Sequence, residues 1–424
     1  MVNVTGTNAN EKINTGFVSP TVLGMPGAGI DLIRAKGGND KVSAGPGNDD
    51  VRLGGGNDTF TWNLGDGDDV VNGQGGNDTF KFNGSMGDDF PGIGKGFYPF
   101  WGDGDLSKTI FSANIGDEPE LKNIEKVKIE LREGMDSATV GELSGTGITK
   151  VIIDLSRTAG KAPDGEEDIV TANGSKGRDD ISVLPTGNGF KILGLGADVK
   201  VKHIDEGMDG VTLKGLGGKD TLDASGLPKN YLDVTLEGGN GKDTLIGSKG
   251  DDYLGGGKGK DSIDGGKGDD DIYGDGGKDN IFGDKGGDLI EGGDGDDRID
   301  GGKGGDLISG GLGRDIMTGG KGADGFYFKE DYALDQTDVI RDFEVGKDTI
   351  YLSAAWFPEL GATVDSAEFV TGSAALLASQ RLIYNDQNGV LSYDKDGVGG
   401  AAAVEIAKIG KGLALTYLDF EMAA

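Results

Sequence analysis

Large apolar residues recur every ninth position between residues 238 and 327, and polar or charged residues flank most of them. Ser262, Ile263 and Asp264 show the pattern, in which polar, apolar and polar positions alternate and one side chain points inward from a short strand. Glycines at the first, second and fourth positions of most units allow the positive φ angles of a tight turn. Ten such units follow one another without an insertion, which predicts a repeat architecture of turns and short strands.

The sixth position of every unit is an aspartate. Two turns and two strands bring the chain back to its start, so two nine-residue units form one coil. Aspartates two units apart are therefore predicted to stack in two columns along the repeat block. One column holds Asp243, Asp261, Asp279, Asp297 and Asp315, and the other holds Asp252, Asp270, Asp288, Asp306 and Asp324.

The apolar column is too thin to hold such a stack together alone. One buried isoleucine contributes about 1.5–3 kcal/mol, whereas ordering the backbone costs about 1–2 kcal/mol for every residue. Aspartates on neighbouring coils about 4.8 Å apart would also repel one another. Carboxylates and turn carbonyls are the oxygen ligands that calcium prefers. We therefore expect several calcium ions along both columns.

The units, such as GGKGKDSID and GGKGDDDIY, resemble the GGxGxDxUx nonapeptide of the repeats-in-toxin (RTX) calcium-binding proteins. This resemblance implies an all-β fold, a parallel β-roll or β-solenoid, that forms when calcium binds. It also implies export by a type I secretion system, so the expected location is extracellular or at the cell surface.

A shorter, degenerate repeat block is predicted at residues 25–87, after a polar lead-in at residues 1–24. Asp31 is the first aspartate at the sixth position of this nine-residue pattern, and two extra residues after Thr61 shift the positions that follow. The expected calcium ligands of this block are Asp40, Asp49, Asp58, Asp69 and Asp78.

Residues 88–105 form a glycine- and proline-rich loop that gathers aromatic residues. Two interpretations remain open, a stacking platform for a sugar or partner and a hydrophobic plug that seals the roll, and we favour the plug. The aromatic residues are Phe90, Phe97, Tyr98, Phe100 and Trp101.

Residues 106–237 break the nonapeptide but keep short strands, which predicts a β-rich spacer, either a solenoid or a sandwich. Two isolated repeat-like units inside it place Asp179 and Asp220 at the sixth position, and we expect Asp220 to be a further calcium ligand.

Residues 328–424 resemble the segment that follows the repeats in type I secreted proteins such as the serralysins. A solenoid needs a cap on its open end, and we expect this segment to provide one. The stretch LALTYLDFEMAA would carry the secretion signal. The amino-terminal stretch MVNVTGTNANEKI lacks the basic and apolar regions of a Sec-type signal.

Charge narrows the class of partner. The chain has 73 acidic and 41 basic residues and a net charge of −32, which argues against nucleic acid and anionic membrane surfaces as direct binding partners. No apolar stretch approaches the ~18 residues of a membrane span. The expected partners are calcium ions and the type I secretion machinery, and an extracellular polysaccharide or cell surface is a further candidate.

Catalytic motifs are missing from the sequence. His203 is the single histidine, which excludes an H-E-x-x-H zinc site, and no G-x-S-x-G nucleophile motif occurs. Because His203 follows alternating valine and lysine residues, we predict that it lies at the surface of a strand. We expect no enzyme activity and a surface, matrix or binding role. The alternatives are a glycan-active enzyme carried on the rolls and a pore-forming or bacteriocin-like effector.

Overall fold

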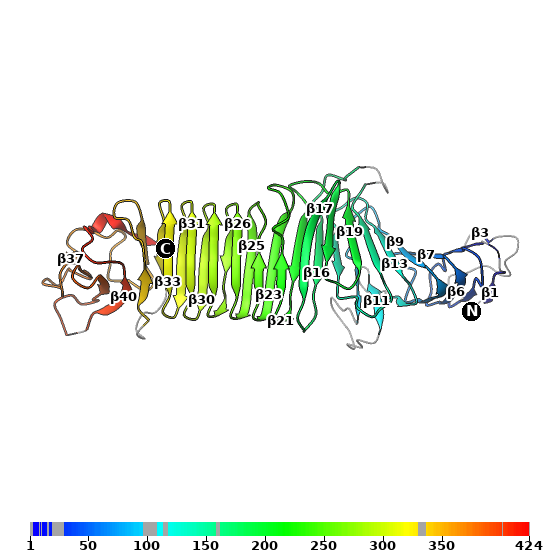
Figure 1. The fold of residues 1–424 in the computed structure, drawn as a ribbon, viewed down its shortest axis with the longest axis horizontal. Coiled ribbons are helices and arrows are strands. Elements are labelled where there is room, and N and C mark those ends of the chain that lie inside the picture. The colour runs from blue at the N-terminus through cyan, green and yellow to red at the C-terminus, as the bar shows by residue number, and fades with distance from the viewer. Residues whose placement is uncertain are drawn as a thin grey trace. The chain divides into compact units, whose positions relative to one another are not determined.

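A computed structural model describes residues 3–7, 9, 11–14, 17–18, 29–95, 108–112, 118–157, 162–329, 336–400 and 402–423. The chain divides into two compact units, one of Met1–Lys214 with Tyr231–Asp233 and one of Gly215–Asn230 with Val234–Ala424. Short strands dominate both units (Figure 1). The described residues hold one short 3-10 helix, η2 (Tyr417–Asp419), and none of their helices is long and apolar enough to cross a membrane. The predicted all-β fold is confirmed.

In the second unit, successive nonapeptides contribute strands alternately to two sheets, in which the strands run parallel (Figure 1). The first sheet contains β23 (Asp233–Gly241), β25 (Asp252–Gly259), β27 (Asp271–Tyr273), β28 (Gly276–Gly277), β30 (Leu289–Asp294), β32 (Leu307–Leu312) and β34 (Gly325–Phe328). The second contains β22 (Thr221–Asp223), β24 (Thr244–Ile246), β26 (Ser262–Lys267), β29 (Asn280–Lys285), β31 (Arg298–Lys303) and β33 (Ile316–Lys321).

The apolar eighth position of each nonapeptide forms the core of this unit. Ile272 pairs with Ile290 and Ile290 with Ile308, so residues 18 apart lie in register in the first sheet. Ile281 pairs with Ile299 in the same way in the second sheet. All of these isoleucines have a relative exposure of 0%. The predicted coil of two nonapeptides is therefore confirmed.

Glycine is required in the turns because consecutive coils lie against each other there. Gly304 has a φ of 142°, and a Cβ at this position would overlap the carbonyl oxygen of Gly286 in the preceding coil. Asp275 and Asp284 replace the second glycine of their nonapeptides and adopt φ angles of 65° and 68°. Aspartate tolerates this left-handed conformation better than most residues.

Both sheets of the second unit continue beyond the repeats. In the first sheet, β34 pairs with β36 (Thr349–Ser353), which pairs with β41 (Phe420–Ala423). In the second, β33 pairs with β35 (Asp338–Ile340) and β35 with β40 (Val404–Lys408), and then come β39 (Val390–Tyr393), β38 (Leu382–Asn385) and β37 (Phe369–Thr371). The boundaries assigned to the cap and secretion signal stay a prediction.

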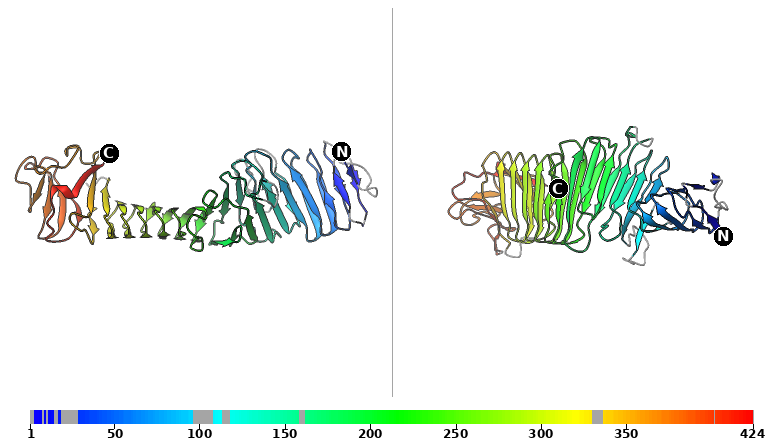
Figure 2. Two further views of the ribbon diagram at one scale, coloured as in Figure 1. Left: turned by 90° about the horizontal axis from the view of Figure 1, so that it is seen from above. Right: turned by 45° about the vertical axis from the view of Figure 1, so that its right-hand side comes forward.

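The first unit also consists of two sheets of mostly parallel strands (Figure 2). One contains β1 (Asn3–Thr5), β4 (Leu32–Arg34), β6 (Asp50–Gly56), β8 (Val70–Gly76), β12 (Glu120–Lys122), β10 (Gly92–Lys95), β11 (Thr109–Ser112), β14 (Ser137–Val140), β16 (Ile169–Asn173) and β20 (Gly210–Lys214). The other contains β2 (Lys12–Asn14), β3 (Phe17–Val18), β5 (Lys41–Val42), β7 (Thr59–Asn63), β9 (Thr79–Asn83), β13 (Lys126–Glu130), β15 (Lys150–Asp154), β17 (Asp180–Thr186), β18 (Gly189–Leu193) and β19 (Asp198–Lys202). Strand β13 pairs in parallel with both β9 and β15, so spacer strands continue the sheet of the repeats as in a solenoid.

Aromatic side chains fill the core of the first unit. Phe80, Phe82 and Trp62 surround Phe111 of β11, with ring centroids 4.9, 5.3 and 5.9 Å from its ring. The prediction of a loop at residues 88–105 is wrong for Gly92–Lys95, which form β10 and pair with β11 and β14. Of the aromatic residues in this segment, Phe90 is 53% exposed. The rest lie outside the described residues, namely Phe97, Tyr98, Phe100 and Trp101.

Candidate metal centres

The sixth-position aspartates of the second unit form two hydrogen-bonded ladders. The backbone N–H of Asp261 donates to Oδ1 of Asp279 at 2.7 Å, and the N–H of Asp279 donates to Oδ1 of Asp297 at 2.7 Å. In the other ladder the N–H of Asp270 donates to Oδ1 of Asp288 at 2.9 Å. Each carboxylate is thereby fixed by the backbone of the coil before it. The predicted stacking of the aspartates is confirmed, and their binding of metal stays a prediction.

The second oxygen of most of these carboxylates has no hydrogen-bond partner although it is buried. Such an oxygen loses its hydration on folding and gains no donor in return, which is costly for a charged group. The Oδ2 atoms concerned belong to Asp243, Asp261, Asp270, Asp279, Asp288, Asp297, Asp306 and Asp315. One unsatisfied oxygen per nonapeptide is the regular feature that a bound cation would explain.

The first glycine of each nonapeptide leaves space beside this oxygen. A Cβ on Gly265 would lie 2.6 Å from Oδ2 of Asp270 and 3.1 Å from the carbonyl oxygen of Gly283 in the next coil. A Cβ on Gly301 would lie 2.5 Å from Oδ2 of Asp306 in the same way. Carboxylate and carbonyl oxygens therefore border one small space, and these are the hard ligands that suit calcium. The residues fit the metal that the repeats imply.

Burial raises the pKa of the ladder carboxylates. It raises the pKa of Asp270 to about 8 and of Asp279 to about 7, and repulsion by the neighbouring aspartates of the ladder adds to the effect. Burial raises the pKa of both Asp315 and Asp338; repulsion by Asp297 adds to the effect on Asp315, and repulsion by Asp315 adds to the effect on Asp338. Without a cation, the folded stack favours protonated carboxyl groups.

The calcium-free chain is therefore expected to be more stable at about pH 5.5 than at pH 8. A carboxyl group with a raised pKa in the folded state contributes stability that is complete below its unfolded pKa of 3.8. That contribution is lost as the pH rises through folded-state values such as about 6 for Asp261 and about 8 for Asp270. Melting followed by circular dichroism in calcium-stripped buffer measures the difference. A higher melting temperature at pH 8 would contradict it. Saturating calcium should remove the difference or reverse its sign, because protons compete with the metal.

The first unit repeats this arrangement with less regular spacing. The N–H of Asp40 donates to Oδ1 of Asp58 over 18 residues, and the N–H of Asp58 donates to Oδ1 of Asp78 over 20 residues. The longer step contains the two-residue insertion after Thr61. Burial raises the pKa of Asp69 to about 8. Buried Oδ2 atoms without a partner belong to Asp40, Asp49, Asp58, Asp69 and Asp78.

The ladders extend beyond the nonapeptides to residues that the sequence analysis missed. In the first unit, the N–H of Asp89 donates to Oδ1 of Asp136 at 2.7 Å over 47 residues, and the N–H of Asp136 donates to Oδ1 of Asp168 over 32 residues. In the second unit, Asp338 and Asp348 accept from the N–H groups of Asp315 and Asp324. Each missed aspartate stands two residues before a buried apolar residue, as Asp168 stands before Val170. This short signature could have identified them.

Asp220, the predicted ligand in the spacer, joins a ladder of the second unit. Its N–H donates to Oδ1 of Asp243 at 2.8 Å, and its side chain is 1% exposed. Its role as a calcium ligand stays a prediction.

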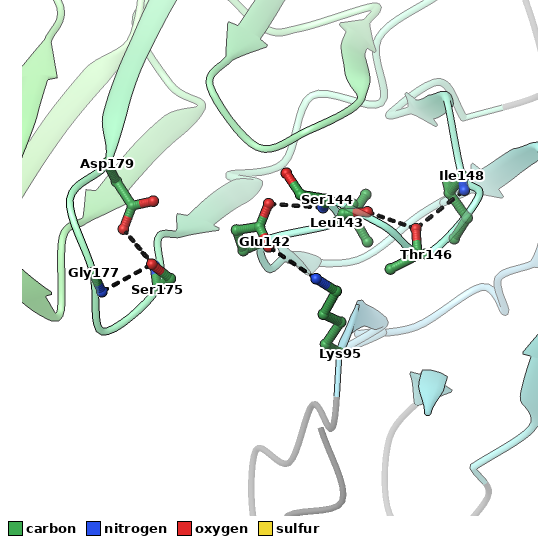
Figure 3. A network of polar contacts seen from close by, with 9 residues as sticks. All are labelled: Lys95, Glu142, Leu143, Ser144, Thr146, Ile148, Ser175, Gly177 and Asp179. Atoms are coloured by element: carbon green, nitrogen blue, oxygen red, sulfur yellow. Dashed lines mark hydrogen bonds and ion pairs between the residues drawn. The ribbon is translucent and has the colours of Figure 1, made fainter. Parts of the chain in front are cut away.

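Three turns carry serine in place of the second glycine, and there the aspartate has nearby donors. In the turn before β17, the N–H and hydroxyl of Ser175 donate to Oδ2 of Asp179 at 2.6 and 2.9 Å (Figure 3). Ser248 donates to Asp252 through its N–H and, at 2.8 Å, through its hydroxyl. Ser85 and Asp89 form the third pair. Asp252 is thus satisfied differently from the other predicted ligands, and we expect it to contribute less to metal binding.

The neighbouring spacer turn closes without a buried carboxylate. The hydroxyl of Thr146 donates to the carbonyl of Leu143 and accepts from the N–H of Ile148 (Figure 3). Glu142 accepts from the N–H of Ser144 and lies 3.4 Å from the ammonium of Lys95. Backbone and side-chain hydrogen bonds together satisfy the polar groups of this turn, which sets it apart from the aspartate turns.

His203 differs from its predicted place in a strand. It lies one residue beyond β19, adopts a φ of 59° and has a side chain that is 15% exposed. Its Nδ1 lies 2.7 Å from Oδ1 of Asp154, and the hydroxyl of Ser156 donates to the same oxygen. The serine hydroxyl and the imidazole therefore contact the same carboxylate oxygen.

Comparison with known families identifies the repeats. A family model described as the RTX calcium-binding nonapeptide repeat (4 copies) matches residues 26–60, 63–90, 235–263, 255–290 and 291–326. Among solved structures, the chain is similar to the AlgE6R3 subunit of the mannuronan C5-epimerase from Azotobacter vinelandii, with 21% identity. This similarity covers 43% of the present chain and 79% of that subunit, with a TM-score of 0.20. No curated protein matches the chain.

Proposed function

We propose that the nonapeptides of this chain, which match a model of RTX calcium-binding repeats, act as a folding switch in a protein secreted by a type I system. The observation that carries the proposal is the buried, unpartnered Oδ2 that recurs once in most nonapeptides. A calcium titration of the purified chain, followed by circular dichroism, tests the folding half of the proposal.

The ladder aspartates are the residues that would hold calcium. Their Oδ1 atoms are already engaged by backbone N–H groups, so each side chain is oriented before a metal arrives. When bound, calcium supplies positive charge and accepts about six to eight oxygen ligands. The carboxylates of Asp261, Asp279 and Asp297 then no longer have to be protonated for the coils to stack.

The same charges keep the chain extended when calcium is scarce. A net charge of −32 repels compact states, and repeats rich in glycine lose much entropy on folding. Inside a cell the repeats would therefore stay unfolded and able to pass through an export channel. Outside, calcium at about 10⁻⁴–10⁻³ M, the affinity range of extracellular modules, stabilises the folded state selectively.

We propose a non-catalytic role at a cell surface, in a matrix or in binding an extracellular polysaccharide. The single histidine of the sequence supports it, because an H-E-x-x-H zinc site needs two. The expected ligand class can be tested by incubating the calcium-loaded chain with acidic and neutral polysaccharides and measuring co-sedimentation.

Deleting residues 413–424 is expected to keep most of the protein inside the cell. The reason is that the stretch LALTYLDFEMAA would carry the export signal. The measurement is an immunoblot of cells and medium from a host with a type I transporter, beside the same host without it. Export of the shortened chain at the level of the full chain would refute this assignment. Because the deletion removes β41, which pairs with β36, the calcium response of the purified shortened chain serves as a folding control.

A further inference from the structure

Three carboxylates come together in the first unit, outside the nonapeptide repeats. Asp136 stands directly before β14, Asp168 directly before β16, and Asp164 lies in the turn that leads to β16. One oxygen from each lies within 4.8 Å of the others. Asp136 and Asp168 are 2% and 1% exposed, and Asp164 is half-buried. Like charges this close and this shielded from water repel strongly unless something neutralises them.

Each of the three side chains has one oxygen fixed by the backbone and one without a partner. Oδ1 of Asp136 accepts from the N–H of Asp89, and Oδ1 of Asp168 accepts from the N–H of Asp136. Oδ1 of Asp164 accepts from the N–H of Glu166 at 3.1 Å. All three Oδ2 atoms are buried and lack a hydrogen-bond partner. The cluster therefore holds three unsatisfied oxygens, one on each of its carboxylates.

The loop that carries Asp164 is anchored to the stack. Pro163 forms an isolated β-bridge with Ser156, and the N–H of Arg157 donates to the carbonyl of Ala162 at 3.1 Å. The N–H of Gly165 donates to Oδ2 of Asp205 at 2.9 Å. These contacts lie on both sides of Asp164 in the sequence, so the loop backbone itself presents this carboxylate to the ladder.

The surroundings of the cluster add further negative charge. Burial raises the pKa of Asp136 to about 7 and of Asp168 to about 8. The charged neighbours that raise these values further are all carboxylates, among them Asp88 and Asp209. Asp205 has the same effect on Asp164. The site is therefore electrostatically suited to a cation.

We propose that Asp136, Asp164 and Asp168 bind a calcium ion at a site that no nonapeptide provides. Two ligands come from the aspartate ladder, and the third comes from a loop whose sequence, Asp-Gly-Glu-Glu-Asp at residues 164–168, lacks the paired glycines of the repeats. Three carboxylates match the hard oxygen ligands and the variable geometry that calcium accepts. The ion would fix the loop of residues 162–168 on the stack. This site goes beyond the folding switch, because its ligands lie outside the nonapeptides.

Hydrogen exchange followed by mass spectrometry tests the site in the full chain, because it reports each segment separately. The variants are Asp164→Asn, which removes one ligand charge, and Glu167→Gln, which removes an exposed charge from the same loop. In the wild-type chain and in Glu167→Gln, calcium at ten times its dissociation constant should slow exchange in residues 162–170 about tenfold. In Asp164→Asn this segment should respond little.

The repeat block of residues 238–327 provides an internal reference. We expect its exchange to slow with calcium in all three proteins. If it does so while residues 162–170 respond alike in Asp164→Asn and the wild-type chain, or respond in neither, the proposed site is wrong and the folding switch stands. Loss of the response in Glu167→Gln as well as in Asp164→Asn would also overturn the site, because general loop charge would then explain it. A failure of the repeat block alone would count against the folding switch only.

Discussion

In excess chelator, residues 238–327 are expected to lose their strand structure, and millimolar calcium is expected to restore it. One site occupied at a hundred times its dissociation constant stabilises the folded state by about 2.7 kcal/mol. A domain is typically stable by about 5–15 kcal/mol. Four or five such sites would therefore contribute about 11–14 kcal/mol, which is comparable to the whole stability of an ordinary domain. The columns of buried side chains that include Ile281 and Ile299 are too thin to offset the backbone entropy lost on folding.

Far-ultraviolet circular dichroism and thermal melting during a calcium titration measure this effect. Magnesium at the same concentration is the control, because it requires a stricter octahedral geometry and gives up its water reluctantly. We expect little recovery of strand signal with magnesium. Identical spectra and melting temperatures in chelator and in calcium would refute both the role of the aspartate ladders and the export model built on it.

Asp279→Asn is expected to lower the melting temperature in calcium by about 5–10 °C. The asparagine keeps an oxygen that can accept the N–H of Asp261, but it loses the charge and the Oδ2 atom. Loss of one well-occupied site costs about 2.7 kcal/mol, and about 1 kcal/mol corresponds to 2–4 °C in a domain of 150–250 residues. Melting curves and the calcium midpoint of the spectral change measure the effect.

Asp223→Asn is the matched control for this substitution. Asp223 lies at the end of β22, where its Oδ1 accepts from the N–H of Ser225, and it has no place in a ladder. We expect its calcium midpoint to equal that of the wild-type chain. Equal shifts in the two variants would mean that total negative charge, rather than the position of the carboxylate in the ladder, controls the response. In calcium-free buffer Asp279→Asn should be no less stable than the wild-type chain, because it relieves repulsion by Asp261 and Asp297.

The strict nine-residue period made the second unit predictable. Asp279 and Ile281 occupy fixed positions in a motif without insertions, so their stacking and burial follow from the geometry of a two-nonapeptide coil. The inward direction of Ile281 needs only the alternation of side chains along a strand. In the first unit, the same logic located Asp58 and Asp78 despite the two extra residues between them.

The spacer was less predictable because its turns have different lengths. Asp136 follows Asp89 in the ladder after 47 residues, and Asp168 follows Asp136 after 32 residues. A search for one fixed period cannot register such steps, although the backbone pairing of β14 with β16 is the same as in the repeats. Strands β14 and β16 are short and follow loops of different lengths, so their alternation of side chains is a weak signal in the sequence.

The hydrogen-bond partners of individual side chains were the hardest feature to predict from the sequence. The sequence shows a serine in the second position of three turns. Its hydrogen bond to the aspartate of the same turn depends on the turn geometry, which the sequence does not show. The contact of His203 with Asp154 joins residues 49 positions apart and follows from the pairing of β15 with β19. Neither the alternation of apolar residues nor their period contains this information.

The in-register pairing of residues 18 apart has a consequence for how proteins of this design can vary in length. Removing or duplicating one whole coil leaves each remaining carboxylate, glycine and isoleucine opposite an equivalent neighbour. A change of nine residues would instead transfer every later strand to the opposite sheet and join the end segment to the wrong faces. Viable relatives should therefore differ by even numbers of nonapeptides, that is, by whole coils.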